Sequence, residues 1–277
     1  MVRIDAATQL FGVIGNPVRH SLGPILHNGA FREMGLNAAY LAFEVQDLAR
    51  AMEGIRGLGI RGMSVTIPFK SAVIPYLDEL EEVAGRIGAV NTIARRNERL
   101  IGYNTDWSAA IEALEEKVPL AGKNVLLLGA GGAARAVAFG LKERGARVSI
   151  CNRTPQKAAG LARELGFVHL LPADLKRVEA EVLVNATSAG MSPRAEETPV
   201  PREALKEGMI VMDIVYRPLK TRLLREAGER GCRTVDGLEM FARQAAGQLT
   251  IWTGRRPDVE KIRKDLMRSD FLEDAKS

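Results

Sequence analysis

The fold is decided by one stretch of the chain, LLLGAGGAARA at residues 126–136. The apolar run before the glycines predicts a buried strand, and the residues after them predict a helix with an apolar stripe. Glycines in such a turn let the backbone approach a pyrophosphate closely, and the helix N-terminus offers that anion free N–H groups. Ala134 stands at the third position of the usual G-x-G-x-x-G/A fingerprint. An ordinary strand–turn–helix connection is the alternative at this point.

The sequence around this turn alternates strand-like and helix-like segments. Apolar runs recur after it at 148–150, 168–171, 182–184, 210–212 and 234–235. Strands that alternate with helices predict βαβ units and a parallel sheet. We therefore expect a doubly wound, Rossmann-type domain here.

The end of the second strand indicates which nucleotide would bind. An enzyme that binds NAD carries Asp or Glu there for the ribose 2′-hydroxyl, but residues 149–154 read SICNRT, without an acid. Arg153 can pair with a 2′-phosphate, and Asn152 and Thr154 can donate hydrogen bonds to it. This pattern favours NADP. The alternative is that Arg153 is a solvated surface residue and Thr154 only caps the next helix.

Composition limits the classes of protein to consider. The 277 residues are 46% hydrophobic and 26% charged, with a net charge of +5 that is scattered along the chain. Scattered charge argues against a nucleic-acid partner, and no apolar run is long enough to span a membrane. Cys151 and Cys232 form no metal-binding or redox spacing, so we expect no metal and a cytoplasmic protein without disulfides.

The first hundred residues are also of α/β type and carry four polar groups. Strands are expected at 10–14, 39–45 and 63–67, a hairpin at 91–96 and 100–103, and Asp47 as a helix cap. Four of the polar positions could each be functional or merely structural, as helix caps or surface residues: Ser21, Lys70, Asn91 and Asp106.

Taken together, ordered motifs along nearly the whole chain resemble the shikimate dehydrogenase family. They are GNPxxHSxxP at 15–24, VTIPFK at 65–70, GAVNT at 88–92, NTD at 104–106, GAGGA at 129–133, NRT at 152–154, NATSAGM at 185–191, DIVY at 213–216 and DGLEM…QA at 236–245. The resemblance implies reversible reduction of 3-dehydroshikimate to shikimate by NADPH. It implies a substrate domain at 1–106, a Rossmann-type NADP domain at 107–237, and C-terminal helices at 238–277 that pack back on the first domain.

The resemblance also implies roles for individual residues. Lys70 and Asp106 would form the catalytic pair. Residues expected to contact the substrate are Ser21, Gly23, Thr66, Asn91, Tyr216 and Gln244, with Asp106 among those that hold ring hydroxyls. Residues expected to contact NADP are Gly129, Ala130, Gly131, Gly132, Ala133, Asn152, Arg153, Thr154, Thr187, Ser188, Met191, Ile214 and Gly237.

Lysine and aspartate suit this reaction. As hydride adds to the ketone carbon, the carbonyl oxygen gains negative charge and needs a proton. An ammonium at Lys70 can stabilise that charge and donate the proton, and a carboxylate at Asp106 can orient both groups. A structural ion pair is the alternative for these two residues.

The chain departs from the family pattern at Gly23, where relatives usually carry a second serine. A hydrogen bond to a charged group is worth roughly 1.5–3 kcal/mol, so its loss should weaken binding of the shikimate carboxylate. We also expect open space near ring carbon 1, where quinate bears an extra hydroxyl. A quinate or dual-specificity dehydrogenase is therefore one alternative. A second is a regulator that binds NADP without catalysis, which the presence of both Lys70 and Asp106 disfavours. The sequence leaves oligomeric state open, a homodimer included.

Overall fold

A computed structural model describes residues 4–268. The chain divides into two compact units. Unit 1 holds the described residues up to Thr105 and again from Gln244 onward, and unit 2 holds Asp106–Arg243. The division between the units thus falls inside one helix, α8 (Gly237–Thr253).

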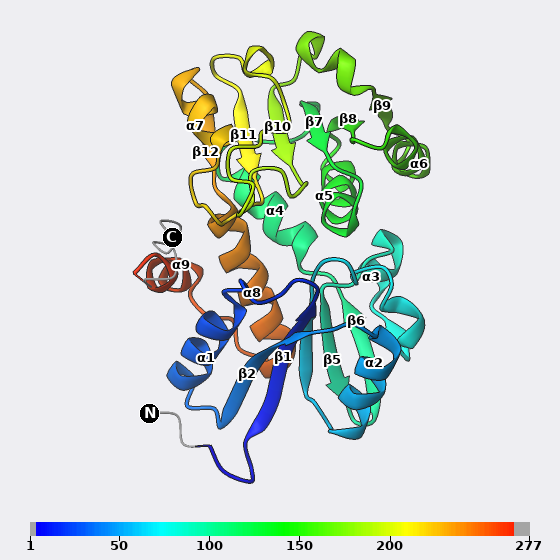
Figure 1. The fold of residues 1–277 in the computed structure, drawn as a ribbon, viewed down its shortest axis with the longest axis vertical. Helices are drawn as coiled ribbons and strands as arrows, with labels where there is room; N and C mark the ends of the chain where they lie inside the picture. Colours follow the sequence, from blue (N-terminus) through cyan, green and yellow to red (C-terminus); the bar gives the residue numbers. More distant parts are fainter. Residues whose placement is uncertain (1–3, 269–277) are drawn as a thin grey trace. The chain divides into compact units, whose positions relative to one another are not determined.

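Unit 1 is built on a mixed sheet of strand order β2-β1-β3-β5-β6-β4 (Figure 1). Its strands are β1 (Gln9–Gly15), β2 (Ala38–Glu44), β3 (Gly62–Val65), β4 (Glu79–Leu80), β5 (Thr92–Arg96) and β6 (Arg99–Tyr103). β1 runs parallel to β2 and β3, whereas β5 is antiparallel to β3 and β6. The predicted hairpin is therefore confirmed. The strand expected at 63–67 stops at Val65, because Thr66 accepts a turn hydrogen bond from Phe69 N at 2.9 Å.

The helices of unit 1 come from both ends of the chain. They are α1 (Gly23–Glu33), α2 (Leu48–Gly57), α3 (Glu82–Ile87), the later part of α8, and α9 (Val259–Met267), with a 3₁₀ turn at Ile74–Tyr76. The Asp47 side chain accepts from Arg50 N, which confirms it as the cap of α2. α9 packs against α1, and the Trp252 indole donates to Ile93 O at 3.0 Å. The later part of α8 and α9 therefore pack on unit 1.

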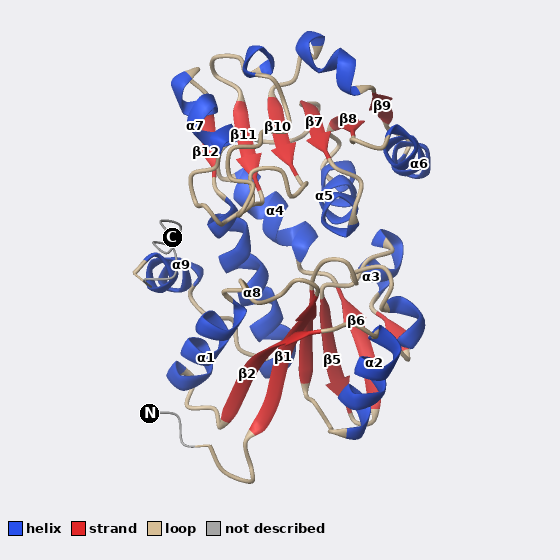
Figure 2. Cartoon of the chain, in the orientation of Figure 1, coloured by secondary structure: helices blue, strands red, loops and turns tan. Residues whose placement is uncertain are grey.

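Unit 2 contains a parallel sheet of strand order β12-β11-β10-β7-β8-β9 (Figure 2). Its strands are β7 (Asn124–Leu128), β8 (Arg147–Cys151), β9 (Val168–Leu170), β10 (Val182–Asn185), β11 (Ile210–Asp213) and β12 (Arg233–Val235). Successive strands are added outward from β7 on one side and then outward from β10 on the other. This is the doubly wound, Rossmann-type order, and it confirms the predicted fold class.

Helices follow most strands of unit 2 and supply its core. They are α4 (Asp106–Glu115), α5 (Gly132–Glu143), α6 (Pro155–Leu165), α7 (Arg222–Glu229) and the start of α8, with 3₁₀ turns at Pro172–Arg177 and Arg202–Ala204. Leu127, Val184 and Met212 of the central strands are fully buried against the helices, beside Val137 and Leu141 of α5. The apolar runs recognised in the sequence are thus strands of this sheet, and β9 and β12 among them lie at its edges.

Across residues 4–268, the helices all lack the length or the continuous apolar character that a bilayer crossing demands.

Candidate functional site

The polar residues singled out in unit 1 gather at one edge of its sheet. Gly15 ends β1 and Val65 ends β3, and the two parallel strands finish side by side. β5 is antiparallel to β3, so it begins at the same edge, with Thr92 opposite Ser64. The segments that contain Ser21, Thr66–Lys70 and Asn91 therefore all leave the sheet at this carboxyl edge.

The β1–α1 turn holds residue 23 tightly. Ser21 Oγ accepts from Gly23 N at 3.1 Å, and the N-cap of α1 is Leu22, so Ser21 is not the helix cap. A Cβ added at Gly23 would lie 3.1 Å from Ser21 Oγ, 3.1 Å from Tyr40 Cε1 and 3.2 Å from Tyr40 Oη. A side chain at position 23 would therefore press on Tyr40 and Ser21.

Thr66 and Lys70 lie on the turn that follows β3. Both side chains are partly exposed. Thr66 N donates to Ile14 O at 3.0 Å, and Lys70 O accepts from Val90 N at 2.7 Å. These backbone bonds fix the turn against β1 and against the segment that leads to Asn91.

Asn91 is completely buried and is held by its neighbours. Its Oδ1 accepts from Thr92 Oγ1 at 2.7 Å and from Thr105 N at 2.8 Å, while its Nδ2 donates to Thr105 Oγ1 at 2.9 Å. Thr105 Oγ1 also donates to Gln244 O at 3.2 Å. Thr105 thus joins Asn91 to the backbone of Gln244, and Gln244 lies on the part of α8 that belongs to unit 1.

Two of the predicted substrate-side residues belong to unit 2. Asp106 is the first residue of α4 and is only 1% exposed. A carboxylate at this position is favoured by the helix dipole. Tyr216 follows β11, and its ring stacks on Phe241 with 4.8 Å between the centroids.

The glycine-rich turn of unit 2 has the form expected of an anion site. Gly129 adopts φ +116°, and a Cβ there would lie 2.8 Å from Ala186 O, so only glycine fits without strain. Gly131 is the N-cap of α5, and no side chain within residues 4–268 caps that helix. Ala130, Gly132 and Ala133 complete the turn, and none of the three is fully buried. The first N–H groups of α5 are therefore available to a phosphate.

The next helix of unit 2 begins in the same way. Arg153 and Thr154 are exposed, just beyond the end of β8. Thr154 occupies the N-cap position of α6, but its side chain makes no capping hydrogen bond. Asn152 Nδ2 donates to Thr154 O at 3.0 Å and so fixes this turn. The hydroxyl of Thr154 is not consumed by capping, contrary to the structural alternative.

The loops after β10 and β11 are joined by a buried network that the sequence did not single out. Asp213 accepts from Asn185 Nδ2 at 2.9 Å, from Val215 N at 3.0 Å and from Thr221 Oγ1 at 2.7 Å. Asn185 Oδ1 in turn accepts from Thr187 Oγ1 at 2.7 Å. Burial, opposed by these three donors, raises the pKa of Asp213 to about 6.

The remaining predicted cofactor contacts lie on the same loops. Ser188 is partly buried and Met191 is 38% exposed, both after β10. Ile214 follows β11, and Gly237 opens α8 at a position where an added Cβ would clash with Val215 O. All predicted NADP-side segments of unit 2 therefore leave the sheet at the carboxyl ends of parallel strands, where α/β folds bind their ligands.

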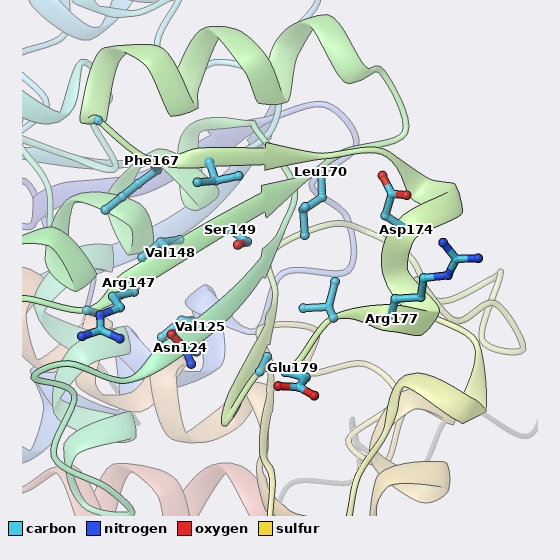
Figure 3. Close-up of a pocket in the computed structure, with 15 residues that line it drawn as sticks. Asn124, Val125, Arg147, Val148, Ser149, Phe167, Leu170, Asp174, Arg177 and Glu179 are labelled. Atoms are coloured by element: carbon cyan, nitrogen blue, oxygen red, sulfur yellow. The ribbon is translucent and has the colours of Figure 1, made fainter.

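A surface pocket of about 770 Å³ lies elsewhere in unit 2 (Figure 3). It is formed near the amino ends of β7, β8 and β9 by residues such as Asn124, Arg147 and Val168, with Asp174 and Arg177 from the 3₁₀ turn. No predicted site residue lines it. The pocket therefore lies away from the loops at the carboxyl edge that carry the predicted site residues.

The fold and the arrangement of this edge define a class of protein, the two-unit α/β proteins with a Rossmann-type nucleotide-binding unit. Three family models match the chain: the shikimate dehydrogenase substrate binding domain at 13–93, shikimate/quinate 5-dehydrogenase at 112–226, and the shikimate 5′-dehydrogenase C-terminal domain at 237–267. The chain belongs to the shikimate dehydrogenase family.

Individual relatives align with this chain over almost their full lengths. A shikimate dehydrogenase (NADP(+)) of Thermococcus kodakarensis is 49% identical, with 97% of this chain and 98% of the relative covered. A crystal structure of a shikimate dehydrogenase in complex with NADP⁺ has a TM-score of 0.90 at 42% identity, covering 96% of each chain. The Thermus thermophilus enzyme in complex with NADP(H) and shikimate has a TM-score of 0.87 at 40% identity, covering 94% of this chain and 99% of that one.

Proposed function

We propose that this protein is an NADP-dependent shikimate dehydrogenase, which reversibly reduces 3-dehydroshikimate to shikimate. The observation that carries the proposal is the placement of the motifs. The family's substrate-side motifs leave the carboxyl edge of the unit 1 sheet, and its cofactor-side motifs leave the carboxyl edge of the unit 2 sheet. The names of the relatives supply the substrate and the cofactor.

Unit 2 fits a dinucleotide with a 2′-phosphate. The uncapped N-terminus of α5 and the Gly129 turn would hold the pyrophosphate. The guanidinium of Arg153 would pair with the 2′-phosphate, assisted by Asn152 and Thr154. Residues of the loops after β10 and β11, and the start of α8, would line the nicotinamide: Thr187, Ser188, Met191, Ile214 and Gly237. The chemistry that bound NADPH supplies is donation of hydride to the ketone carbon.

Unit 1 would bind the substrate. The hydroxyl of Ser21 would donate to the carboxylate, and Thr66, Asn91 and Gln244 would hold ring hydroxyls. Tyr216 of unit 2 would lie near the carboxylate. Asn91 is already fixed by Thr105, so little conformational entropy would be lost when it binds.

Lys70 and Asp106 are proposed as the catalytic residues. The Lys70 ammonium would donate a proton to the carbonyl oxygen as negative charge develops there, and it would recover that proton in the reverse direction. The Asp106 carboxylate would accept from the same substrate hydroxyl and keep the ammonium oriented. A regulator without catalysis would have no need of either group.

The test is NADPH formation from NADP⁺ in the presence of shikimate or of quinate, with kcat/KM measured for each. We expect a strong preference for shikimate. Activity on neither substrate would leave the fold in place and remove the proposed function.

A quinate or dual-specificity enzyme is the second candidate, and its support is the glycine at position 23. That support is reduced by the tight packing of Tyr40 against Gly23. Comparable kcat/KM values for quinate and shikimate would establish this candidate in place of the first.

The cellular setting and the assembly state are proposals of the same standing. Cys151 and Cys232 are both unpaired, which suits a reducing cytoplasm. A homodimer is one assembly that the sequence leaves open, and sedimentation equilibrium would identify it.

We propose the substrate role for unit 1 and the cofactor role for unit 2.

A further inference from the structure

A chain of buried polar side chains crosses unit 1 from β2 to the start of β5. Tyr40 Oη donates to Ser64 Oγ at 2.6 Å, and Ser64 Oγ donates to Gln248 Oε1 at 3.0 Å. Gln248 Nε2 donates to Asn91 O at 3.2 Å and to Thr92 Oγ1 at 3.1 Å. Tyr40, Ser64 and Gln248 are 1%, 8% and 2% exposed. A polar atom buried this deeply is costly to leave without a hydrogen bond, so these side chains are held to one another.

The direction of the donors fixes the orientation of each amide. Gln248 Oε1 faces the Ser64 hydroxyl, so its amino group must face the start of β5. Thr92 Oγ1 accepts from that amino group and therefore turns its own proton toward Asn91 Oδ1, at 2.7 Å. The carbonyl end of the Asn91 amide therefore accepts from Thr92 and also from Thr105 N, at 2.8 Å, and the two donors fix its direction together. Its Nδ2 end must point the other way, as a donor.

The other end of the chain contacts the β1–α1 turn. The Tyr40 ring stacks on His27 with 4.2 Å between centroids and 6° between planes, and His27 Nδ1 bonds Gly23 O at 2.9 Å. Tyr40 is therefore held from behind, while its Oη lies 3.2 Å from the Cβ position of residue 23. A side chain added at position 23 would therefore contact the Tyr40 hydroxyl.

We propose that Tyr40, Ser64 and Gln248 are positioning residues for the substrate site, and that their hydrogen bonds act through Thr92, together with the N–H of Thr105, to hold the Asn91 amide in place. This inference rests on the proposed function. None of the three needs to touch the substrate, because they act through Asn91.

The test compares Ser64→Ala and Tyr40→Phe with Thr250→Val in the full chain. Thr250 lies on the same helix as Gln248, and its hydroxyl bonds Ala246 O of its own helix at 2.8 Å. Ser64→Ala breaks the chain in the middle, so we expect about a tenfold rise in KM for shikimate. Tyr40→Phe keeps the stacked ring and should give a smaller rise. KM for NADP⁺ should stay within about twofold in both variants, since the change is confined to substrate binding.

A merely structural role would give a different result. It would lower the thermal midpoint without separating the two KM values, and that outcome would overturn the proposal. Normal KM for shikimate in Ser64→Ala would do the same. Wild-type protein without activity on shikimate would remove the proposed function and this inference together, whereas an active wild type with unaffected variants would remove the inference alone.

Discussion

The carboxyl edges of the two sheets present different kinds of polar group. In unit 1 the polar groups at this edge are mainly side chains, namely buried amides and hydroxyls such as those of Asn91, Thr92 and Ser64. In unit 2 it is equipped mainly with backbone: a glycine turn and two helix N-termini without side-chain caps. Backbone N–H groups suit a phosphate in any setting, whereas the ring hydroxyls of one substrate require particular side chains. Changes in unit 1 should therefore alter substrate chemistry, and changes in unit 2 should alter cofactor affinity.

The largest effect should come from Lys70→Ala. Loss of a general acid typically lowers the rate by about 10²–10⁴-fold, so kcat should fall by that order while affinity for NADP⁺ is retained. Lys264→Ala, at an exposed position of α9, is the matched control. Near-normal turnover in the Lys70 variant would remove lysine from the mechanism.

The backbone of unit 2 should be most sensitive at Gly129. Alanine there would place a Cβ 2.8 Å from Ala186 O at φ +116°, and a strained site of this kind costs roughly 1–3 kcal/mol. Gly131→Ala meets open space and should fold normally. We expect calorimetry to show a lower thermal midpoint for Gly129→Ala only, and titration to show weaker NADP⁺ binding for both. Equal thermal midpoints would contradict the strain argument.

Arg153→Ala tests the cofactor preference. Loss of a charged hydrogen-bonding partner should raise KM for NADP⁺ by about 10–100-fold, from roughly 1.5–3 kcal/mol, with little change for NAD⁺. Arg163→Ala, exposed on α6, is the control. The assignment of Arg153 to the 2′-phosphate fails should both cofactors respond alike.

Gly23→Ser should sharpen the view of unit 1. The family serine would restore a hydroxyl, but its Cβ would press on Tyr40 and Ser21. We expect KM for shikimate to rise by a few-fold, since overpacking typically costs about 1–3 kcal/mol and part of it can relax. A fall in KM would mean that Tyr40 yields and that the glycine is simply a lost contact.

The sequence predicted what depends on local pattern and missed what depends on distant residues. The Asp47 cap, the hairpin and the glycine turn are short-range features, and each was confirmed. The hydrogen bond between Ser64 and Gln248 joins residues 184 positions apart, and no local sequence pattern predicts it. The contact between Tyr40 of β2 and the Cβ position of residue 23 on α1 is a second case, because the two residues lie on different elements.

The smallest effect is expected for the pH dependence of stability, where one buried group in each unit opposes the other. Burial lowers the pKa of His27 from 6.5 to about 4. Between these two pH values the unfolded chain binds more protons than the folded chain, so the contribution of His27 to stability rises with pH. Burial raises the pKa of Asp213 from 3.8 to about 6, so the folded chain binds more protons there and stability falls as pH rises. Each difference corresponds to roughly 3 kcal/mol, and the two nearly cancel between pH 4 and 6.

Single variants should uncover the hidden slopes. Relative to wild type, His27→Gln removes the rising contribution, so its free energy of unfolding in urea should fall from pH 4 to 6. Asp213→Asn removes the falling contribution, so its free energy should rise over the same range. Slopes of the same sign in the two variants would show that at least one group titrates near its ordinary pKa. Opposite slopes would show that each unit contains one buried group with a shifted pKa, His27 in unit 1 and Asp213 in unit 2.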